Sequence, residues 1–385
     1  METDILDPPR AFGTPLFNAV LKKTASDFQV YEHLTIDLAG SGEHLYLQIE
    51  KTSMNTDEVV SILQTVYSVQ SADIGLCGLK DRHAVATQWF SVKTPNNTSP
   101  FEQAAMQFNE TQASDQQLLA REAKGNDAYC KCMRLISHKR HQRKLRHGAH
   151  SANSFRLCLR SLTFVNEESE AQGRQMVEQR IQRLASSGFP AFIGPQRFGF
   201  GAQNLHRARQ WFASPRKRIS RQKRSLYLSV ARSAVYNTVL AQRVRDGSWQ
   251  HLLGGEPAVL SGSRSFFIPD EGQTQAAQAH GAEAQTIDQR LREFDVHPSV
   301  PWWGRGATVA KDACAIYEAD ILAPLASLQH GLERAGLSQE RRAARAKASE
   351  LAYEWLAPDS LELCFSLAPG VFATTLVHQL GCITE

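Results

Sequence analysis

The sequence predicts an α+β protein built on a mixed, mainly antiparallel sheet flanked by helices. Apolar and polar residues alternate around Phe28 and along residues 44–50, which is typical of strands with one buried face. Residues 55–69 instead place apolar side chains at helical spacing behind a start that resembles a capping box. A stretch rich in glycine, proline and aromatic residues, 188–201, is predicted to be the hinge into a second unit.

The remaining elements follow from the same two periodicities. We predict strands at residues 88–92, 154–160 and 361–367, helices at 170–186, 225–245 and 338–356, a hairpin at 259–268 and a short helix at the end of the chain. The predicted helix 338–356 is charged and carries Trp355. Residues 95–130 are polar and are expected to contribute some helix.

Composition places the chain among globular proteins of two or three domains. It has 385 residues, of which 42% are hydrophobic and 21% charged, and no apolar run approaches the length of a membrane span. The first residues are acidic and proline-rich, unlike a secretory signal, so we expect a cytoplasmic protein with no membrane contact. The seven cysteines lack metal-ligand spacing and the glycine-rich nucleotide motifs are absent, so we expect no metal and no cofactor.

Residues 78–94 carry the most concentrated set of reactive side chains. A glycine opens a turn, Lys80, Asp81, Arg82 and His83 follow, and an apolar strand comes next. Cations beside Asp81 keep a carboxylate ionised, as a nucleophile must be. Taken alone, the stretch fits a turn-closing aspartate paired to Lys80 or Arg82 better, because such ion pairs are common.

Positive charge is concentrated in two segments without any acidic residue. Residues 131–160 hold nine Lys/Arg and four His, and residues 179–245 hold fourteen Lys/Arg, with a dense run just before residue 225. Solvated basic helices are the ordinary explanation for such runs. The missing acids favour a nucleic acid as partner, and the dense run lacks the bulky apolar face that a membrane surface requires. The residues expected to contact the phosphate backbone are Arg143, Lys144, Arg146, Arg221, Lys223 and Arg224.

Seven motifs occur in order along almost the whole chain. They are KxxxxDFxVxE at 22–32, GEHLYLQIEK at 42–51, GLKDRHAVATQWFSV at 78–92, HQRKLRHGAHSANSFRLCLR at 141–160, GPQRFG at 194–199, SLYLSVARSAVYN at 225–237 and PGVFATT at 369–375. With these motifs the chain resembles the TruD family of tRNA pseudouridine synthases. One departure is that the family usually reads Pro-Asn-Tyr-Phe-Gly where residues 190–194 read Pro-Ala-Phe-Ile-Gly, which removes an amide at Ala191 and a hydroxyl at Phe192.

The resemblance implies a domain organisation and a reaction. A pseudouridine-synthase catalytic domain would comprise residues 1–187 and 347–385, and a helix-rich TRUD domain would be inserted at residues 188–346. The implied reaction is the isomerisation of uridine to pseudouridine in tRNA, usually at position 13, on a base that is flipped out of its stack. No cofactor or metal is implied, and we expect a monomer.

The resemblance also assigns roles to individual residues. Asp81 matches the catalytic aspartate, and Lys22 matches the lysine that holds this aspartate charged and oriented. Asn153 and Phe155 lie on one face of a strand, where the family uses them to hydrogen-bond to and to stack on the extruded base. From the residues alone, Lys22 is better explained as a solvated lysine at the start of a strand.

Phe372 matches a further aromatic residue of the family's pocket, and Phe28 is expected to line the same cavity. Core packing is the simpler explanation for Phe28, and for Phe372 both explanations stay open. A non-catalytic RNA-binding protein or RNA chaperone would also have the basic segments, although it would not need Asp81, Lys22 and Asn153. A metal-dependent nuclease would need further carboxylates beside Asp81, which the sequence does not supply.

Overall fold

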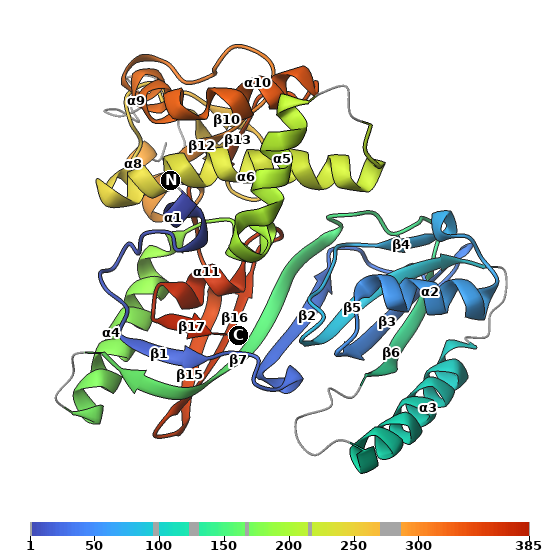
Figure 1. The fold of residues 1–385 in the computed structure, drawn as a ribbon. Coiled ribbons are helices and arrows are strands. Elements are labelled where there is room, and N and C mark those ends of the chain that lie inside the picture. The colour runs from blue at the N-terminus through green and yellow to red at the C-terminus, as the bar shows by residue number, and fades with distance from the viewer. Residues whose placement is uncertain are drawn as a thin grey trace, which may run out of the picture. The chain divides into compact units, whose positions relative to one another are not determined.

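The computed structural model describes residues 2–94, 100–122, 131–165, 169–214, 218–269 and 286–384, which form two compact units (Figure 1). The unit that we call the sheet unit consists of Leu16–Val177, Ala348–Gly370 and Gly381–Glu385. The unit that we call the helical unit consists of Met1–Pro15, Glu178–Lys347 and Val371–Leu380. The chain first passes from the sheet unit to the helical unit within helix α4 (Glu170–Ser187). The predicted domain limits, 1–187 with 347–385 and 188–346, stay a prediction.

The sheet unit is built on a ten-stranded sheet in which seven strands follow the order β15-β16-β7-β2-β5-β3-β6, while β1, β17 and β4 pair off this path. The pairs β1–β17 and β2–β5 are parallel, and the neighbours of β7 and β3 run antiparallel to them. The predicted α+β fold with a mixed, mainly antiparallel sheet is therefore confirmed. The strands are β1 (Phe17–Val20), β2 (Phe28–Leu34), β3 (His44–Thr52), β4 (Ile74–Leu76), β5 (Val85–Lys93), β6 (Cys132–His141), β7 (His150–Phe164), β15 (Ser349–Ala357), β16 (Ser360–Leu367) and β17 (Cys382–Thr384).

Two helices cover one face of β3 and β5. Helix α2 (Thr56–Tyr67) begins after Asn55, whose backbone N–H donates to the Glu58 carboxylate at 2.6 Å and completes a capping box. Apolar side chains of α2 and of α3 (Phe101–Glu122) pack with those of β3 and β5 in a single core. The helix predicted at 55–69 is confirmed, α3 lies within the polar segment 95–130, and α4 matches the helix predicted at 170–186.

The prediction that β3 has one solvated face is wrong. The side chains of Leu45, Leu47 and Ile49 face the α2–α3 core, but those of Tyr46 and Gln48 on the other face are also buried. Tyr46 packs with Leu145 in a second cluster, and its hydroxyl donates to a carbonyl of the loop between β6 and β7 at 3.0 Å. This loop covers the second face, which the alternation of residues along β3 alone does not reveal.

The helix predicted at 338–356 is also wrong, because this segment forms strands. Ser349–Ala357 is strand β15 and pairs antiparallel with β16. Burial alternates along β15, and Trp355 lies on its half-buried face next to Phe164 and under the guanidinium of Arg174. The apolar residues of this segment fit both a period of two and a helical period, and pairing with a buried neighbour strand selected the first.

The helical unit surrounds one long central helix, α6 (Arg221–Arg245), most of whose second half is buried. The helix begins four residues before the predicted start, because the Ser220 hydroxyl caps it by accepting from the backbone N–H of Lys223. The hairpin predicted at 259–268 is confirmed by the antiparallel pair β9 (Ala258–Leu260) and β10 (Phe266–Phe267). The predicted C-terminal helix is α11 (Ala373–His378), and strand β17 follows it. None of the helices among the described residues is long and apolar enough to cross a membrane.

The other elements of the helical unit are short. Its further helices are α1 (Glu2–Leu6), α5 (Gln203–Ala213), α8 (Ile287–Arg292), α9 (Asp312–Leu322), α10 (Ala326–Arg334) and α11 (Ala373–His378). Its strands are β8 (Phe189–Pro190), β9 (Ala258–Leu260), β10 (Phe266–Phe267), β11 (Val296–His297), β12 (Ser299–Trp302), β13 (Glu340–Ala343) and β14 (Arg345–Ala346). Single turns of 3₁₀-helix occur in both units at Ala25–Asp27, Ser71–Asp73, Pro195–Phe198, Phe200–Ala202, Ser248–Gln250 and Ala323–Leu325.

The residues that depart from the family pattern lie in the core of the helical unit. Ala191, Phe192 and Ile193 are each at most 5% exposed. The backbone of Ile193 exchanges two hydrogen bonds of 2.9 Å with the side-chain amide of Asn237, and the Tyr236 hydroxyl donates to the Ala191 carbonyl at 3.0 Å. Apolar side chains are therefore compatible with this segment, because polar groups of α6 satisfy its backbone.

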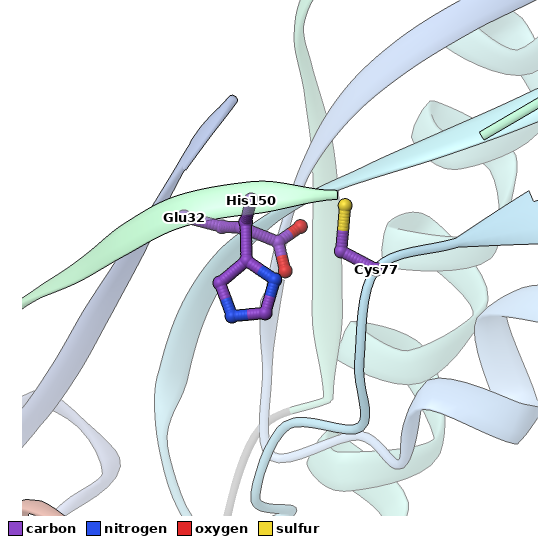
Figure 2. Close-up of side chains that lie close together, drawn as sticks. All are labelled: Glu32, Cys77 and His150. Carbon is purple, nitrogen blue, oxygen red and sulfur yellow. The ribbon is translucent and has the colours of Figure 1, made fainter. Parts of the chain in front are cut away.

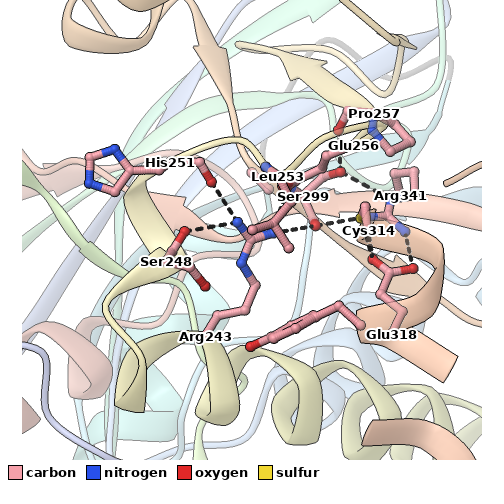
Figure 3. Close-up of polar contacts among 12 residues, drawn as sticks. Arg243, Ser248, His251, Leu253, Glu256, Pro257, Ser299, Cys314, Glu318 and Arg341 are labelled. Atoms are coloured by element: carbon pink, nitrogen blue, oxygen red, sulfur yellow. Dashed lines mark hydrogen bonds and ion pairs between the residues drawn. The ribbon is translucent and has the colours of Figure 1, made fainter. Parts of the chain in front are cut away.

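A buried network of two arginines and two glutamates joins several segments of the helical unit (Figure 3). Arg243 of α6 donates to Glu256 at 2.6 Å, and Arg341 of β13 forms two hydrogen bonds to Glu318 of α9, at 2.7 and 2.9 Å. Ser299 links the two pairs, because its N–H donates to Glu256 and its carbonyl accepts from both arginines. These four charged side chains are at most 6% exposed, so their burial depends on this balance of charge.

We predict that Arg341→Met destabilises the helical unit by about 3–5 kcal/mol, because the Glu318 carboxylate then stays buried without its cation. Urea unfolding followed by tryptophan fluorescence measures this loss. Four of the six tryptophans report on the helical unit, namely Trp211, Trp249, Trp302 and Trp303.

The matched control is Arg290→Met, which removes a partly exposed ion pair with Asp295 in the same unit. This substitution is expected to change the free energy of unfolding by about 1 kcal/mol or less. The double variant Arg341→Met/Glu318→Met is expected to recover most of the lost stability, because neither charge is then left alone. If Arg341→Met and Arg290→Met lost the same free energy of unfolding, this account of the network would be contradicted.

Candidate active site

The site lies where the sheet divides along one edge of β5. On the edge opposite to β3, β2 pairs with residues 85–87 of β5 and β4 pairs with residues 90–92. The backbone N–H of Trp89 falls between these two partners and donates to the Glu32 carboxylate at 3.0 Å. Glu32, whose side chain is fully buried, thus replaces the strand that is missing at this point.

Lys80 reaches into this fork from the loop that connects β4 and β5. Its ammonium lies 3.1 Å from Glu32 Oε1 and donates a short hydrogen bond to Oδ1 of Asn153 on β7. The backbone N–H of Lys80 donates to the Thr56 hydroxyl at 3.0 Å. Both ends of Lys80 are therefore fixed, and the residue that follows it, Asp81, has a defined place at the mouth of the fork.

A second buried lysine holds the backbone of Asp81. Lys51 on β3 donates to the Asp81 carbonyl at 2.8 Å and to the Met54 carbonyl at 2.6 Å. Burial lowers the pKa of Lys51 to about 8. The Asp81 side chain itself is 49% exposed, and its Oδ2 lies 3.4 Å from Nζ of Lys22. The carboxylate is therefore accessible, next to one cation and anchored through its main chain.

Lys22 and two aromatic rings form the wall beside this carboxylate. Lys22 has a left-handed backbone (φ 62°), and its ammonium lies 4.7 Å from the centre of the Phe28 ring. Phe28 contacts Phe155 edge-on at 6.0 Å between ring centres, and Phe155 stacks on Phe365 at 5.5 Å. Phe28 is buried, whereas Phe155 is half-buried.

The structure brings together five of the residues that the sequence singled out. Asp81 and Lys22 form an ion pair, Lys22 lies over Phe28, and Phe28 contacts Phe155. Asn153 joins this group through Lys80 rather than through Asp81 itself. Their catalytic and substrate-binding roles stay predictions.

The other predicted residues lie elsewhere in the chain. Phe372 belongs to the helical unit, where it precedes α11 and packs against the core of that unit. The predicted backbone-binding residues of the sheet unit lie exposed in the loop between β6 and β7, and those of the helical unit lie exposed in the first turn of α6. They are Arg143, Lys144, Arg146, Arg221, Lys223 and Arg224.

Glu32, Cys77 and His150 form the one group among the described residues whose ligand atoms could hold a metal ion, since these atoms lie within 4.8 Å of one another (Figure 2). Two features favour a cluster of hydrogen-bonding groups instead. Glu32 already has the Lys80 ammonium as its cation. Without a metal, burial raises the pKa of Cys77 to about 12, so its thiol keeps its proton and can donate a hydrogen bond.

Sequence reasoning missed the functions of Glu32 and Lys51 and assigned Lys80 only to a turn. Both missed residues end motifs that were recognised, since Glu32 closes KxxxxDFxVxE and Lys51 closes GEHLYLQIEK. A charged residue at the end of a strand has an ordinary explanation as a solvated residue. Their burial, 0% exposed in both cases, is the signal that identifies them, and it is visible only in the fold.

Comparisons with known proteins agree on one family. The family model of tRNA pseudouridine synthase D (TruD) matches residues 10–214 and 202–380. The chain is 37% identical over 374 residues to a tRNA pseudouridine synthase D of Methylococcus capsulatus strain Bath, covering 97% of this chain and 94% of the relative. It is 39% identical over 372 residues to one of Pseudomonas putida strain F1, with the same coverage.

A solved structure shares the fold over almost the whole chain. It is the crystal structure described as that of a tRNA pseudouridine synthase D (TruD) from Methanosarcina mazei, which superposes with a TM-score of 0.66 at 16% identity. The match covers 98% of this chain and 97% of the other. At 16% identity this match supports the fold alone, and the family is identified by the sequence matches. The chain therefore belongs to the tRNA pseudouridine synthase D (TruD) family.

Proposed function

We propose that this protein isomerises uridine to pseudouridine in tRNA, at position 13, with Asp81 as its catalytic carboxylate. The observation that carries this proposal is the half-exposed Asp81 side chain, which sits beside Lys22 on a loop fixed by the buried residues Lys51 and Lys80. Family membership supports the reaction. Position 13 and a cytoplasmic location rest on the family's usual properties alone.

The reaction needs a carboxylate and a place for a base to turn. The N1–C1′ bond of the nucleoside breaks, C5 bonds to C1′, C5 loses its proton and N1 gains one, so the change is an isomerisation. Asp81 serves either by attacking C1′ or by taking a proton from C2′, and both routes require an accessible, ionised oxygen. A side chain that is 49% exposed beside an ammonium provides one.

An aromatic wall offsets the loss of stacking when the base leaves the RNA. Stacking on an aromatic side chain contributes roughly 1–3 kcal/mol per base. Phe155 has an exposed part, whereas Phe28 is only 4% exposed and supports it from behind. We therefore assign the stacking role to Phe155 and a supporting role to Phe28. Phe372 stays a predicted pocket residue.

Asp81→Asn is expected to lower the turnover of tRNA by at least about 10³-fold, because an amide neither attacks C1′ nor takes a proton. Release of tritium from 5-labelled uridine in tRNA measures turnover. The dissociation constant for tRNA is expected to stay within about threefold, since the phosphates hold the RNA.

The control is Asp57→Asn, the same change at an exposed acid in the first turn of α2. It should leave turnover unchanged. Turnover near the wild-type level in Asp81→Asn would remove Asp81 from the proposed role. A wild-type protein that binds tRNA without releasing tritium would favour an RNA chaperone.

The double variant Arg221→Glu/Arg224→Glu is expected to weaken tRNA binding and to flatten its dependence on salt. Each phosphate contact that is lost reduces the slope of log Kd against log salt concentration by about 0.7–0.9. Both side chains are exposed in the first turn of α6, so the fold should tolerate the change. Filter binding between about 50 and 300 mM salt, over which the Debye length falls roughly 2.4-fold, measures the slope.

The matched control is Arg264→Glu/Arg292→Glu, which makes the same change of charge at exposed arginines outside the acid-free segment. This control should keep the wild-type slope. Equal slopes in both double variants would mean that the start of α6 does not face the RNA.

Activity on a prefolded tRNA is expected to survive EDTA, because the proposed reaction uses Asp81 and no metal-bound water. Among the described residues, Glu32, Cys77 and His150 are the group that could bind a metal ion. EDTA therefore tests whether activity needs a metal at these residues. Tritium release in EDTA, compared with release in EDTA plus excess Zn²⁺, gives the answer. A loss that Zn²⁺ restores would contradict the proposal and favour a metal-dependent enzyme.

A further inference from the structure

We infer that Lys80 fixes the side-chain amide of Asn153 in one orientation, so that Asn153 acts only as a hydrogen-bond donor to a carbonyl group of the uracil ring. Lys80 is thus a positioning residue and Asn153 a residue that reads the polarity of the base. This inference rests on the proposed function. It adds the sense of the hydrogen bond and the group that sets it.

The orientation of the amide follows from the chemistry of lysine. An ammonium group has three donors and no acceptor. The amide atom that contacts Lys80 Nζ is therefore the oxygen of Asn153, as the hydrogen bond from Lys80 Nζ to Oδ1 has it. This assignment does not depend on distinguishing the oxygen from the nitrogen of an amide by their positions.

Lys80 is itself held too firmly to release the amide. Its ammonium is 3.1 Å from Glu32 Oε1, and the other Glu32 oxygen accepts from the Trp89 backbone. Glu32 and Asn153 are direct cross-strand partners in the pairing of β2 with β7, so one ammonium reaches both. The exposures of the Glu32 and Lys80 side chains, 0% and 8%, exclude water from competing for these bonds.

The NH₂ group of Asn153 is left for another partner. Among the residues that the structure describes, none accepts a hydrogen bond from Nδ2 of Asn153. This NH₂ group is also not among the buried polar atoms without a partner, which means that it reaches solvent. Asn153 therefore offers a donor, and no acceptor, to a base that stacks on Phe155, two residues further along β7.

This polarity matches uracil. Uracil carries two carbonyl acceptors, O2 and O4, on either side of one N–H donor at N3, and an amide NH₂ can pair only with the carbonyls. Pairing with O4 would distinguish uracil from cytosine, because cytosine has an amino group in place of O4 that would face Asn153 as donor against donor, whereas O2 is common to both bases. A site that pairs its polar groups with one base rejects the base that leaves them unpaired.

The variant Asn153→Asp tests whether Asn153 donates a hydrogen bond to the base or accepts one from it. The carboxylate keeps the contact with Lys80 and has nearly the same shape, yet at pH 8 it has no hydrogen to donate. We expect turnover of tRNA to fall by at least about tenfold while the dissociation constant stays within about threefold and the melting temperature within a few degrees. If Asn153 instead accepts from N3–H, Asp performs the same function and turnover stays within about threefold, which would overturn the inference.

A second measurement tests the inference even if Asn153→Asp is less stable than the wild type. Sulfur accepts hydrogen bonds poorly, so tRNA with 2-thiouridine or 4-thiouridine at the target weakens the bond to one carbonyl. We expect one of these substitutions to slow the wild type more than it slows Asn153→Asp, which identifies the carbonyl. Equal slowing of both proteins by each substitution would overturn the inference.

A third variant tests Lys80 as the positioning residue. Glu32→Gln/Lys80→Met removes both buried charges together, so no lone charge is left in the fork. Without Lys80 the Asn153 amide can turn, so its NH₂ group is expected to contribute less to turnover. Adding Asn153→Asp to this double variant should therefore lower turnover by a smaller factor than it does in the wild type. The same loss in both backgrounds would mean that Lys80 does not set the amide. Failure of wild-type tritium release would instead refute the proposed function.

Discussion

The buried ion pair between Glu32 and Lys80 is the interaction on which the site depends. It forms where β2 and β4 separate along β5 and leave one backbone N–H without a strand partner. A carboxylate satisfies that N–H, and a carboxylate without exposure needs a cation, which Lys80 brings from the loop. The same lysine then holds Asn153. Because the sheet divides here, a backbone N–H is left for the Glu32 carboxylate, and the loop between β4 and β5 supplies the lysine that pairs with this carboxylate.

The loop shows how a reactive side chain stays exposed on a rigid backbone. Lys80 and Lys51 both make their contacts beneath the loop, one through Glu32 and Asn153 and one through the Asp81 carbonyl. Neither contact involves the Asp81 carboxylate, which only Lys22 approaches within ion-pair distance among the described residues. Positioning through the main chain leaves the carboxylate free to meet a nucleoside. In the helical unit, by contrast, the buried arginines and glutamates balance each other's charge and join neighbouring segments of the chain.

Sequence alone predicted the fold class, the capped helix α2 and the grouping of four side chains with Asp81, because these depend on local periodicity and on recognisable motifs. It failed where the partner of a segment decides its structure. Trp355 and its neighbours fit a helical period until β16 pairs with them, and Tyr46 reads as exposed until the loop with Leu145 covers it. Glu32 and Lys51 were missed for the same reason, because a single charged residue in a strand does not reveal that it is buried.

The buried ammonium of Lys51 lowers the stability of the folded protein. Its pKa falls from 10.5 to about 8 in the folded protein, a shift that corresponds to roughly 3 kcal/mol against the buried ammonium. Below pH 8 the lysine is charged in both states and the folded protein carries this penalty in full. Between pH 8 and 10.5 the unfolded chain binds the extra proton, so the penalty declines as pH rises. A methionine would avoid the penalty, but it has no N–H for the Asp81 and Met54 carbonyls. A charged side chain in this buried position is therefore explained by the loop that it holds, since it does not stabilise the fold.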